Sequence, residues 1–153
     1  MSTADRPEQP DESPIGFTAA GSSGDWDVAV DQTTGSPARG HVPGATAIGT
    51  AFGAIESLTE NLAIEVGPAG VRVVCLRTTA NIDSRTIQKT MEAVAKDMHI
   101  TKEQALASMA DLNFLKRPAT VADTAKAAVL LASDGAGMMT GTVVNATAGA
   151  ALD

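Results

Sequence analysis

Apolar residues recur every three or four positions through the middle of the chain, between Ile48 and Val66. This spacing predicts a long helix with one apolar face, and Gly67-Pro68 predicts where the helix ends. The predicted face consists of Ile48, Phe52, Ile55, Leu58, Leu62 and Val66. After Gly70 the period changes, and residues 71–76 form a nearly continuous apolar run that is rich in β-branched side chains. A helix that leads into such a buried strand is typical of a parallel α/β layer.

Shorter patterns flank this unit. Trp26–Val30 alternates apolar and polar residues over the length of a strand, and Thr142–Ala146 is a second short strand candidate. Helical spacing follows over 85–98, and the threonines at 101 and 120 each begin a plausible capping box for a further helix. The predicted order of elements is therefore β-α-β-α-α-α-β.

The chain divides near residue 24. Residues 1–24 combine three prolines with acidic and small polar residues and end in Gly-Ser-Ser-Gly. This composition predicts a disordered or loosely attached arm without fixed structure. The remaining residues, 25–153, are enough for one hydrophobic core and predict a single α/β domain.

Composition and charge narrow the function classes. The net charge of −7 disfavours binding to nucleic acid or to an anionic membrane. No apolar run approaches the roughly 18 residues of a membrane span, and the first residues lack the apolar core of a signal peptide, so we expect a cytoplasmic protein. The single cysteine, Cys75, lies in the apolar strand and is expected to be an inert core thiol. Two histidines, His41 and His99, have no ligand spacing, so no metal site is expected.

Two separated segments carry a family resemblance. They are residues 58–74, LTENLAIEVGPAGVRVV, and residues 115–152, LKRPATVADTAKAAVLLASDGAGMMTGTVVNATAGAAL. In order and spacing they resemble the C-terminal half of the short-chain dehydrogenase/reductase family. The resemblance begins at about residue 44. It implies a truncated Rossmann-like three-layer unit, in which a small parallel sheet of about three strands has helices on its sides.

The same resemblance shows which catalytic residues differ. The family carries a Tyr-x-x-x-Lys pair on its long helix, and here Ile48 and Phe52 stand at those two positions, where neither can move a proton. The family's helper serine would fall near Gly35 or Ser36, and Ser36 fits only with an offset. The Pro-Gly pair that contacts the nicotinamide is replaced by Thr78-Thr79.

The cofactor half of the family's fold is also missing. Only 47 residues precede Ile48, too few for the Gly-rich turn that holds the pyrophosphate. We therefore expect no cofactor, with NAD(P) bound only where a partner chain supplies the nucleotide site.

The first interpretation is a redox-inactive half domain that acts as a binding or association module. Truncation would leave the strand at Trp26–Val30 with an exposed edge, and such edges favour pairing. The partner would be a second copy, giving a homo-oligomer, or a full-length relative. The alternative for this edge is that the arm of residues 1–24 folds back over it.

A second interpretation is a recruited cyclase, isomerase or lyase with an apolar pocket for a hydrophobic small molecule. Its pocket candidates are Ile48, Phe52, Thr78, Thr79 and Met91. Its acid/base candidates are His41, Asp31 and Ser36. A third interpretation is an NAD(P)-dependent oxidoreductase subunit completed by a partner chain, and a fourth is a decayed gene product with a marginal fold.

Overall fold

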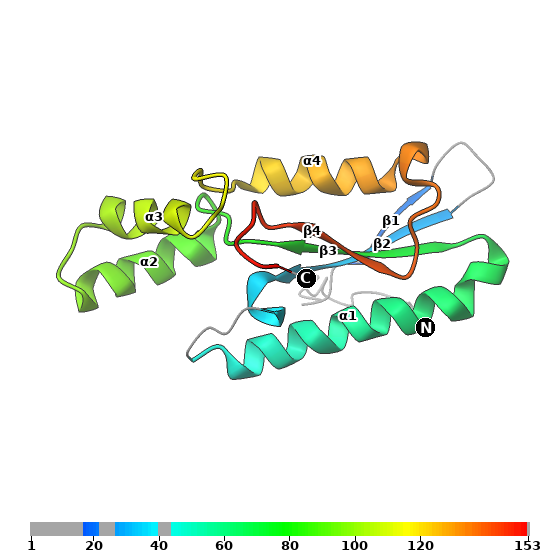
Figure 1. The fold of residues 1–153 in the computed structure, drawn as a ribbon, viewed down its shortest axis with the longest axis horizontal. Helices are drawn as coiled ribbons and strands as arrows, with labels where there is room; N and C mark the ends of the chain where they lie inside the picture. Colours follow the sequence, from blue (N-terminus) through cyan, green and yellow to red (C-terminus); the bar gives the residue numbers. More distant parts are fainter. Residues whose placement is uncertain (1–16, 22–26, 40–43, 153) are drawn as a thin grey trace, which may run out of the picture.

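The computed structural model describes residues 17–21, 27–39 and 44–152, and one four-stranded sheet runs through this part of the chain (Figure 1). The strands are β1 (Phe17–Gly21), β2 (Asp27–Gly35), β3 (Arg72–Thr78) and β4 (Thr142–Ala146), and they lie in the order β1-β2-β3-β4. The last three strands are parallel, and β1 runs antiparallel to β2.

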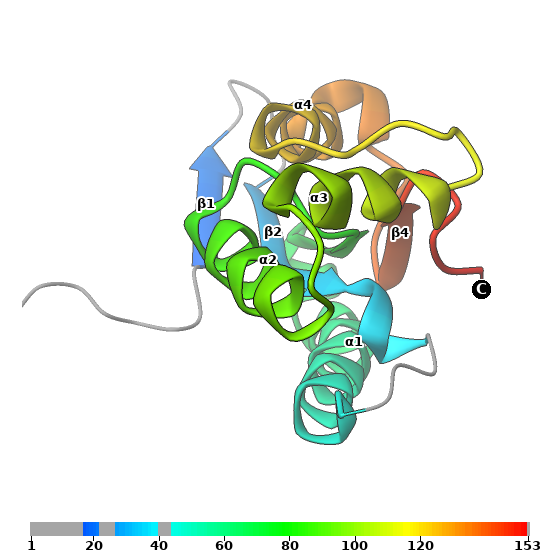
Figure 2. The ribbon, with the colours of Figure 1, turned by 90° about the vertical axis from the view of Figure 1, so that its left-hand side faces the viewer.

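Helices cover both faces of the sheet. α1 (Thr46–Val66) lies on one face and α4 (Val121–Ala132) on the other, which makes three layers (Figure 1). The other two helices, α2 (Arg85–Asp97) and α3 (Lys102–Asp111), pack on each other beyond the carboxyl ends of the parallel strands (Figure 2). The predicted fold class, a truncated Rossmann-like unit with a parallel sheet of three strands, is confirmed.

Local signals in the sequence account for the ends of the helices. The hydroxyls of Thr101 and Thr120 accept hydrogen bonds from the backbone N–H groups three residues later, so both predicted capping boxes are confirmed. Gly70 adopts a φ of +79° after α1, a conformation that glycine allows at little cost. Three short 3₁₀ helices complete the secondary structure: η1 (Ser36–Ala38), η2 (Gly67–Ala69) and η3 (Asp134–Ala136).

The N-terminal segment differs from the prediction. Residues 17–21 were expected to lack fixed structure, but they form β1, which pairs with β2 from Phe17 opposite Asp31 to Gly21 opposite Asp27. The prediction of an exposed edge on the strand near residues 26–30 is therefore wrong, because β1 satisfies the backbone groups along that edge. The alternative, in which the N-terminal segment folds back over the edge, holds for these five residues. Residues 1–16 and 22–26 lie outside the described part.

The helix α1 has the predicted length but a different buried face. Its buried residues are Glu56, Thr59 and Ala63, whereas Ile48 and Leu58 are 50% and 45% exposed. Two members of the predicted apolar face therefore lie largely in solvent. The other four predicted residues, Phe52, Ile55, Leu62 and Val66, are half-buried.

The apolar core lies between the sheet and α4. Val74 and Leu76 of β3 pack with Leu131 of α4, and half-buried alanines and valines of α4 and β4 surround them. Cys75 is fully buried in β3, as predicted, and burial raises the pKa of its thiol. Within the described residues, no helix is both long enough and apolar enough to span a bilayer.

Candidate functional site

The two positions that correspond to the family's catalytic pair lie near the start of α1. Ile48 is half exposed, and Phe52 is half-buried one turn later. A Cβ atom on Gly35 would lie only 2.8 Å from Cε2 of Phe52, so the aromatic ring occupies the space that a side chain at residue 35 would need. Phe52, at the family's lysine position, thus lies against Gly35, which is one of the two candidate positions for the helper serine.

Among the described residues, the other predicted site residues form no acid/base pair beside this contact. The hydroxyl of Thr78 is buried and donates to the backbone oxygen of Thr34 at 3.2 Å. Thr79 follows the end of β3, Ser36 begins η1, and Met91 is half-buried on α2. His41 and the side chain of Asp31 lie outside the described part, so their candidate roles stay predictions.

A buried ion pair joins α1 to β3. Both oxygens of the Glu56 carboxylate accept hydrogen bonds from Arg77, with Nε–Oε1 at 2.7 Å and Nη2–Oε2 at 3.0 Å. Glu56 and Arg77 are only 2% and 1% exposed. The geometry is the bidentate arrangement that gives arginine its strongest contacts with carboxylates. Sheet and helix are therefore held in one register by a directional contact.

Two further donors complete the environment of Glu56. Thr34 Oγ1 donates to Oε1, and Arg39 Nε donates to Oε2, both at 3.2 Å. Burial alone would raise the pKa of Glu56, but Arg77, with help from Thr34 and Arg39, outweighs burial and holds this pKa below its ordinary value. The carboxylate is ionised at neutral pH, and its acceptor sites are occupied. It is suited to positioning α1, not to taking a proton from a substrate.

Sequence reasoning missed this pair although a signal was present. Glu56 lies four residues after Phe52 and three before Thr59, which places it on the inward side of α1. Arg77 ends the apolar run of β3. An acidic residue on the inward side of a helix and a basic residue in a buried strand predict an ion pair between the two elements, because a buried charge needs a partner.

The described part contains two cavities near charged residues. One, of about 220 Å³, lies beside Glu56 and is lined by Ala38, Arg39, Gly53, Glu56, Ser57 and Glu60. The other, of about 380 Å³, lies on the opposite side of the sheet, where α4 begins and β4 ends. Among the described residues, no cluster of three or more His, Cys, Asp and Glu side chains could hold a metal ion.

A model of the family described as enoyl-(acyl carrier protein) reductase matches residues 30–151. This chain is a member of the short-chain dehydrogenase/reductase family. The match begins within β2 and continues past β4, so it includes all the parallel strands and all four α-helices.

Relatives in the short-chain dehydrogenase/reductase family share sequence and fold with the chain over part of their own length. The peroxisomal 2,4-dienoyl-CoA reductase SPS19 of Saccharomyces cerevisiae is 34% identical over 110 residues, which cover 72% of this chain and 32% of the relative. Sorbitol-6-phosphate 2-dehydrogenase SrlD from Erwinia amylovora superimposes with a TM-score of 0.72 at 24% identity, over 80% of this chain and 48% of that one.

A third relative was solved with a nicotinamide cofactor. The 3-ketoacyl-(acyl-carrier-protein) reductase from Brucella melitensis, complexed with NADH, gives a TM-score of 0.66 at 24% identity, over 83% of this chain and 45% of that one. The chain thus spans about a third of its curated relative and about half of these two solved structures.

Proposed function

We propose that this member of the short-chain dehydrogenase/reductase family does not transfer hydride and functions by association, with α1 binding α1 of a second copy. The observation that carries the proposal is the apolar surface of α1. Leu58 is 45% exposed and forms an apolar stripe with exposed alanines of α1, although α1 is held firmly to the sheet through Glu56. Large apolar side chains on a fixed helix are the usual material of a protein interface.

The lack of hydride transfer rests on the residues at the catalytic positions. Ile48 stands where the family has its tyrosine and has no proton to give. Phe52 stands where the family has its lysine, and its ring fills the space over Gly35. The hydroxyl of Thr78, where the family has proline, is already bonded within the sheet. At these three described positions there is therefore no side chain free to act as the acid or base of the family's reaction.

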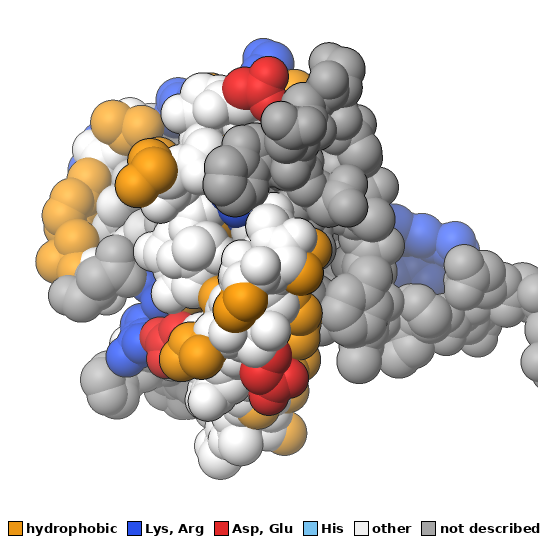
Figure 3. All heavy atoms as spheres, turned by 90° about the vertical axis from the view of Figure 1, so that its right-hand side faces the viewer, with side chains coloured by type: hydrophobic (Ala, Val, Ile, Leu, Met, Phe, Trp, Pro, Cys, Tyr) orange, Lys and Arg blue, Asp and Glu red, His pale blue; other side chains and the backbone are white. Residues whose placement is uncertain are grey.

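The pattern of exposed residues on α1 favours an antiparallel contact with an identical helix. Ala47, Ala51, Ala54 and Leu58 are all exposed and spaced by three or four residues, so they form one stripe along α1. Alanines allow two helices to approach closely. The exposed Glu60 and Glu65 lie nearer the C-terminal end of α1, so an antiparallel pair centred near Ala51 keeps the two acidic ends apart. Figure 3 shows hydrophobic side chains on the surface at the end of the molecule where α1 ends.

The first experiment measures the mass of the particle in solution by light scattering. We expect wild type to have at least twice the mass of one chain. Leu58→Glu places a charge within the apolar stripe of the contact and should give a single chain, because burying an unpaired carboxylate is costly. Ala107→Glu is the matched control, since Ala107 is exposed on α3 and the substitution adds the same charge elsewhere. A wild-type mass of one chain would contradict the proposed association.

A second candidate function has support from the coverage of the relatives. The chain spans 48% of a solved relative with a TM-score of 0.72, so a partner could supply the remaining half and complete a nucleotide site. Titration with NADPH, followed by thermal stability, separates the two functions. We expect no change in melting temperature at saturating NADPH. A saturable increase that Leu58→Glu abolishes would replace the first function with a partner-completed reductase.

A further inference from the structure

The larger cavity lies on the side of the sheet that carries α4, away from the proposed contact on α1 (Figure 1). It has a volume of about 380 Å³ and is bounded by the segment that precedes α4, the first turns of α4 and the end of β4. Its lining consists of Leu115, Arg117, Pro118, Ala119, Asp123, Thr124, Lys126, Asn145, Ala146 and Ala148. The volume falls within the range of about 300–1,000 Å³ that small-molecule sites occupy.

The charged side chains of this cavity leave an excess of positive charge. The Asp123 carboxylate accepts from Thr120 Oγ1 at 2.8 Å and from Arg117 Nη1 at 3.2 Å. The hydrogen bond from the Thr120 hydroxyl, supported by Arg117, lowers the pKa of Asp123, so this acid is ionised and already engaged. Arg117 has further N–H donors beyond the one that it gives to Asp123. Lys126 has no ion-pair partner among the described residues.

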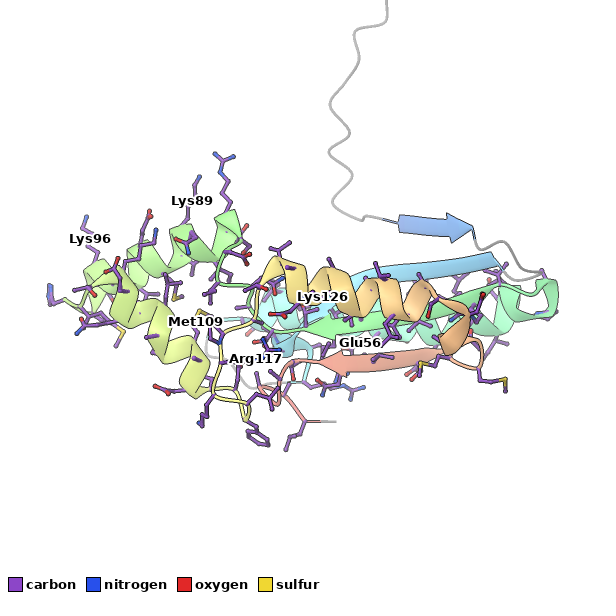
Figure 4. All side chains as sticks on the ribbon, turned by 90° about the horizontal axis from the view of Figure 1, so that it is seen from above. Glu56, Lys89, Lys96, Met109, Arg117 and Lys126 are labelled. Atoms are coloured by element: carbon purple, nitrogen blue, oxygen red, sulfur yellow. The ribbon has the colours of Figure 1, made fainter. Side chains whose placement is uncertain are left out.

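This local excess is notable because the chain as a whole has a net charge of −7. Arg117 and Lys126 come from separate segments, the loop before α4 and α4 itself, and both line the same cavity (Figure 4). The N-terminal end of α4 adds the partial positive charge of its helix dipole on this side. An anionic group is therefore the ligand feature that the cavity electrostatics favour.

Apart from Thr124 and Asn145, the rest of the lining is apolar. Leu115, Pro118 and Ala119 contribute apolar walls from the loop before α4, and Ala146 and Ala148 contribute from the end of β4. A purely polar ion such as inorganic phosphate would leave these walls in contact with water. A ligand with a short apolar body and one anionic end would use both kinds of surface.

The walls of the cavity are fixed by hydrogen bonds between segments. Leu115 N donates to the backbone oxygen of Ala148 at 3.3 Å, which joins the loop to the chain after β4. Asn113 Nδ2 donates to the backbone oxygen of Arg117 at 2.7 Å and holds the loop in its turn. Thr124 Oγ1 donates to Asn81 Oδ1 at 3.0 Å and joins α4 to the loop after β3. A site that is held open in this way costs little free energy to organise for a ligand.

From these observations we propose that the cavity binds a small amphipathic anion: a carboxylate or phosphate monoester on an apolar body of a few carbons. Arg117 and Lys126 bind the anionic end, and the loop and the end of β4 enclose the apolar body. The proposal does not rest on the association through α1, because the two surfaces lie on opposite sides of the sheet.

The test is a titration of the full chain with four probes, followed by two-dimensional amide NMR. The probes are hexanoate, hexyl phosphate, hexanol and inorganic phosphate. Hexanoate or hexyl phosphate should saturate in the millimolar range or below and should shift signals of residues 115–126 and 145–148. Hexanol lacks the charge and inorganic phosphate lacks the apolar body, so each should bind at least about ten-fold more weakly. The relative affinity of the two anions decides between carboxylate and phosphate.

Three variants distinguish binding in this cavity from general attraction of an anion to any surface cation. Lys126→Ala should weaken binding of the preferred anion by about ten-fold or more, whereas Lys89→Ala should leave it unchanged. Lys89 is the matched control because it projects from α2, away from Lys126 and Arg117 (Figure 4). Ala119→Leu keeps every charge but narrows the cavity, and it should also weaken binding, with the melting temperature confirming a folded protein.

Several outcomes would overturn the proposal. They are the absence of saturable binding by both anions, equal affinity for hexanol and hexanoate, and an equal effect of Lys126→Ala and Lys89→Ala. Leu58→Glu should retain full anion binding. Failure of the cavity proposal is therefore distinguishable from failure of the proposed association, which light scattering measures independently.

Discussion

The two faces of the sheet are packed in opposite ways. Towards α4, β3 presents Val74 and Leu76, which form an apolar cluster with Leu131. Towards α1, the same strand presents Cys75 and Arg77, and the central contact is the Arg77–Glu56 ion pair. Apolar packing is non-directional and tolerates small shifts, whereas a bidentate ion pair specifies one register. The strand β3 thus packs on α4 through non-directional apolar contacts, whereas its ion pair on the other side fixes the position of α1.

The buried residues of α1 and α4 reflect the same difference. On α1 they are Glu56, Thr59 and Ala63, two of which are polar. On α4 the buried residue is Leu131, which packs into the apolar cluster. Polar contacts therefore dominate the most buried positions of α1, whereas apolar packing holds α4.

The largest expected effect comes from removing only one of the two charges of the ion pair. Arg77→Met leaves the Glu56 carboxylate buried with only Thr34 and Arg39 as donors, so the free energy of unfolding should fall by about 3–5 kcal/mol. The double variant Glu56→Leu/Arg77→Met removes both charges and should cost less than Arg77→Met alone. Denaturant unfolding of both proteins, with Arg85→Met on the exposed side of α2 as control, measures these values. A double variant that costs as much as Arg77→Met alone, or more, would contradict the coupling of the two charges.

On the α4 side of the sheet, the free energy of unfolding should depend on the volume of the buried apolar side chains, not on charge. Leu131→Ala removes the α4 contribution to the cluster with Val74 and Leu76, and we expect a loss of about 2–4 kcal/mol. The neighbouring Leu130 is 66% exposed, so Leu130→Ala should change stability by less than about 0.5 kcal/mol. Both values should be the same at pH 7 and pH 4. A strong pH dependence of the Leu131→Ala effect would contradict the contrast between the two faces.

The smallest expected effect is the pH dependence that Glu56 contributes. Its pKa is lower in the folded chain than its ordinary value of 4.5, so the unfolded chain binds more protons as the pH falls. The stabilisation by Glu56 is complete above pH 4.5 and is lost as the pH falls through the folded-state pKa. Glu56→Gln should therefore flatten the stability curve below pH 4.5 relative to wild type. Glu60→Gln, an exposed neighbour on α1, is the control, and equal slopes for the two variants would exclude this role.

Much of the fold could be predicted because its signals are local. The spacing from Ile48 to Val66 predicted α1, and the threonines at 101 and 120 predicted the starts of α3 and α4. The strand β1 could not be predicted in this way. Its sequence, Phe-Thr-Ala-Ala-Gly, is short and rich in small residues, and its pairing depends on an edge that exists only once β2 has joined the sheet.

The candidate sites were less predictable, for a different physical reason. Glu56 and Arg77 are 21 residues apart in the sequence, and they meet only because α1 packs against β3 in one particular register. The cavity beside Lys126 draws its lining from the loop before α4, from α4 and from the end of β4, and no single pattern contains all three. The resemblance to the family identified positions 48 and 52. It did not indicate that Phe52 would pack over Gly35.

The close approach of the Phe52 ring to Gly35 favours one order of substitution at these two residues over the other. Any side chain at residue 35 would place its Cβ 2.8 Å from the ring of Phe52, so a serine there requires the ring to be replaced or moved first. A path of substitutions that begins at residue 52 avoids the clash, whereas a path that begins at residue 35 requires the ring of Phe52 to shift. We therefore expect the effects of substitutions at the two positions to be coupled. A lineage that acquired this phenylalanine could regain a side chain at residue 35 freely only by changing residue 52 beforehand.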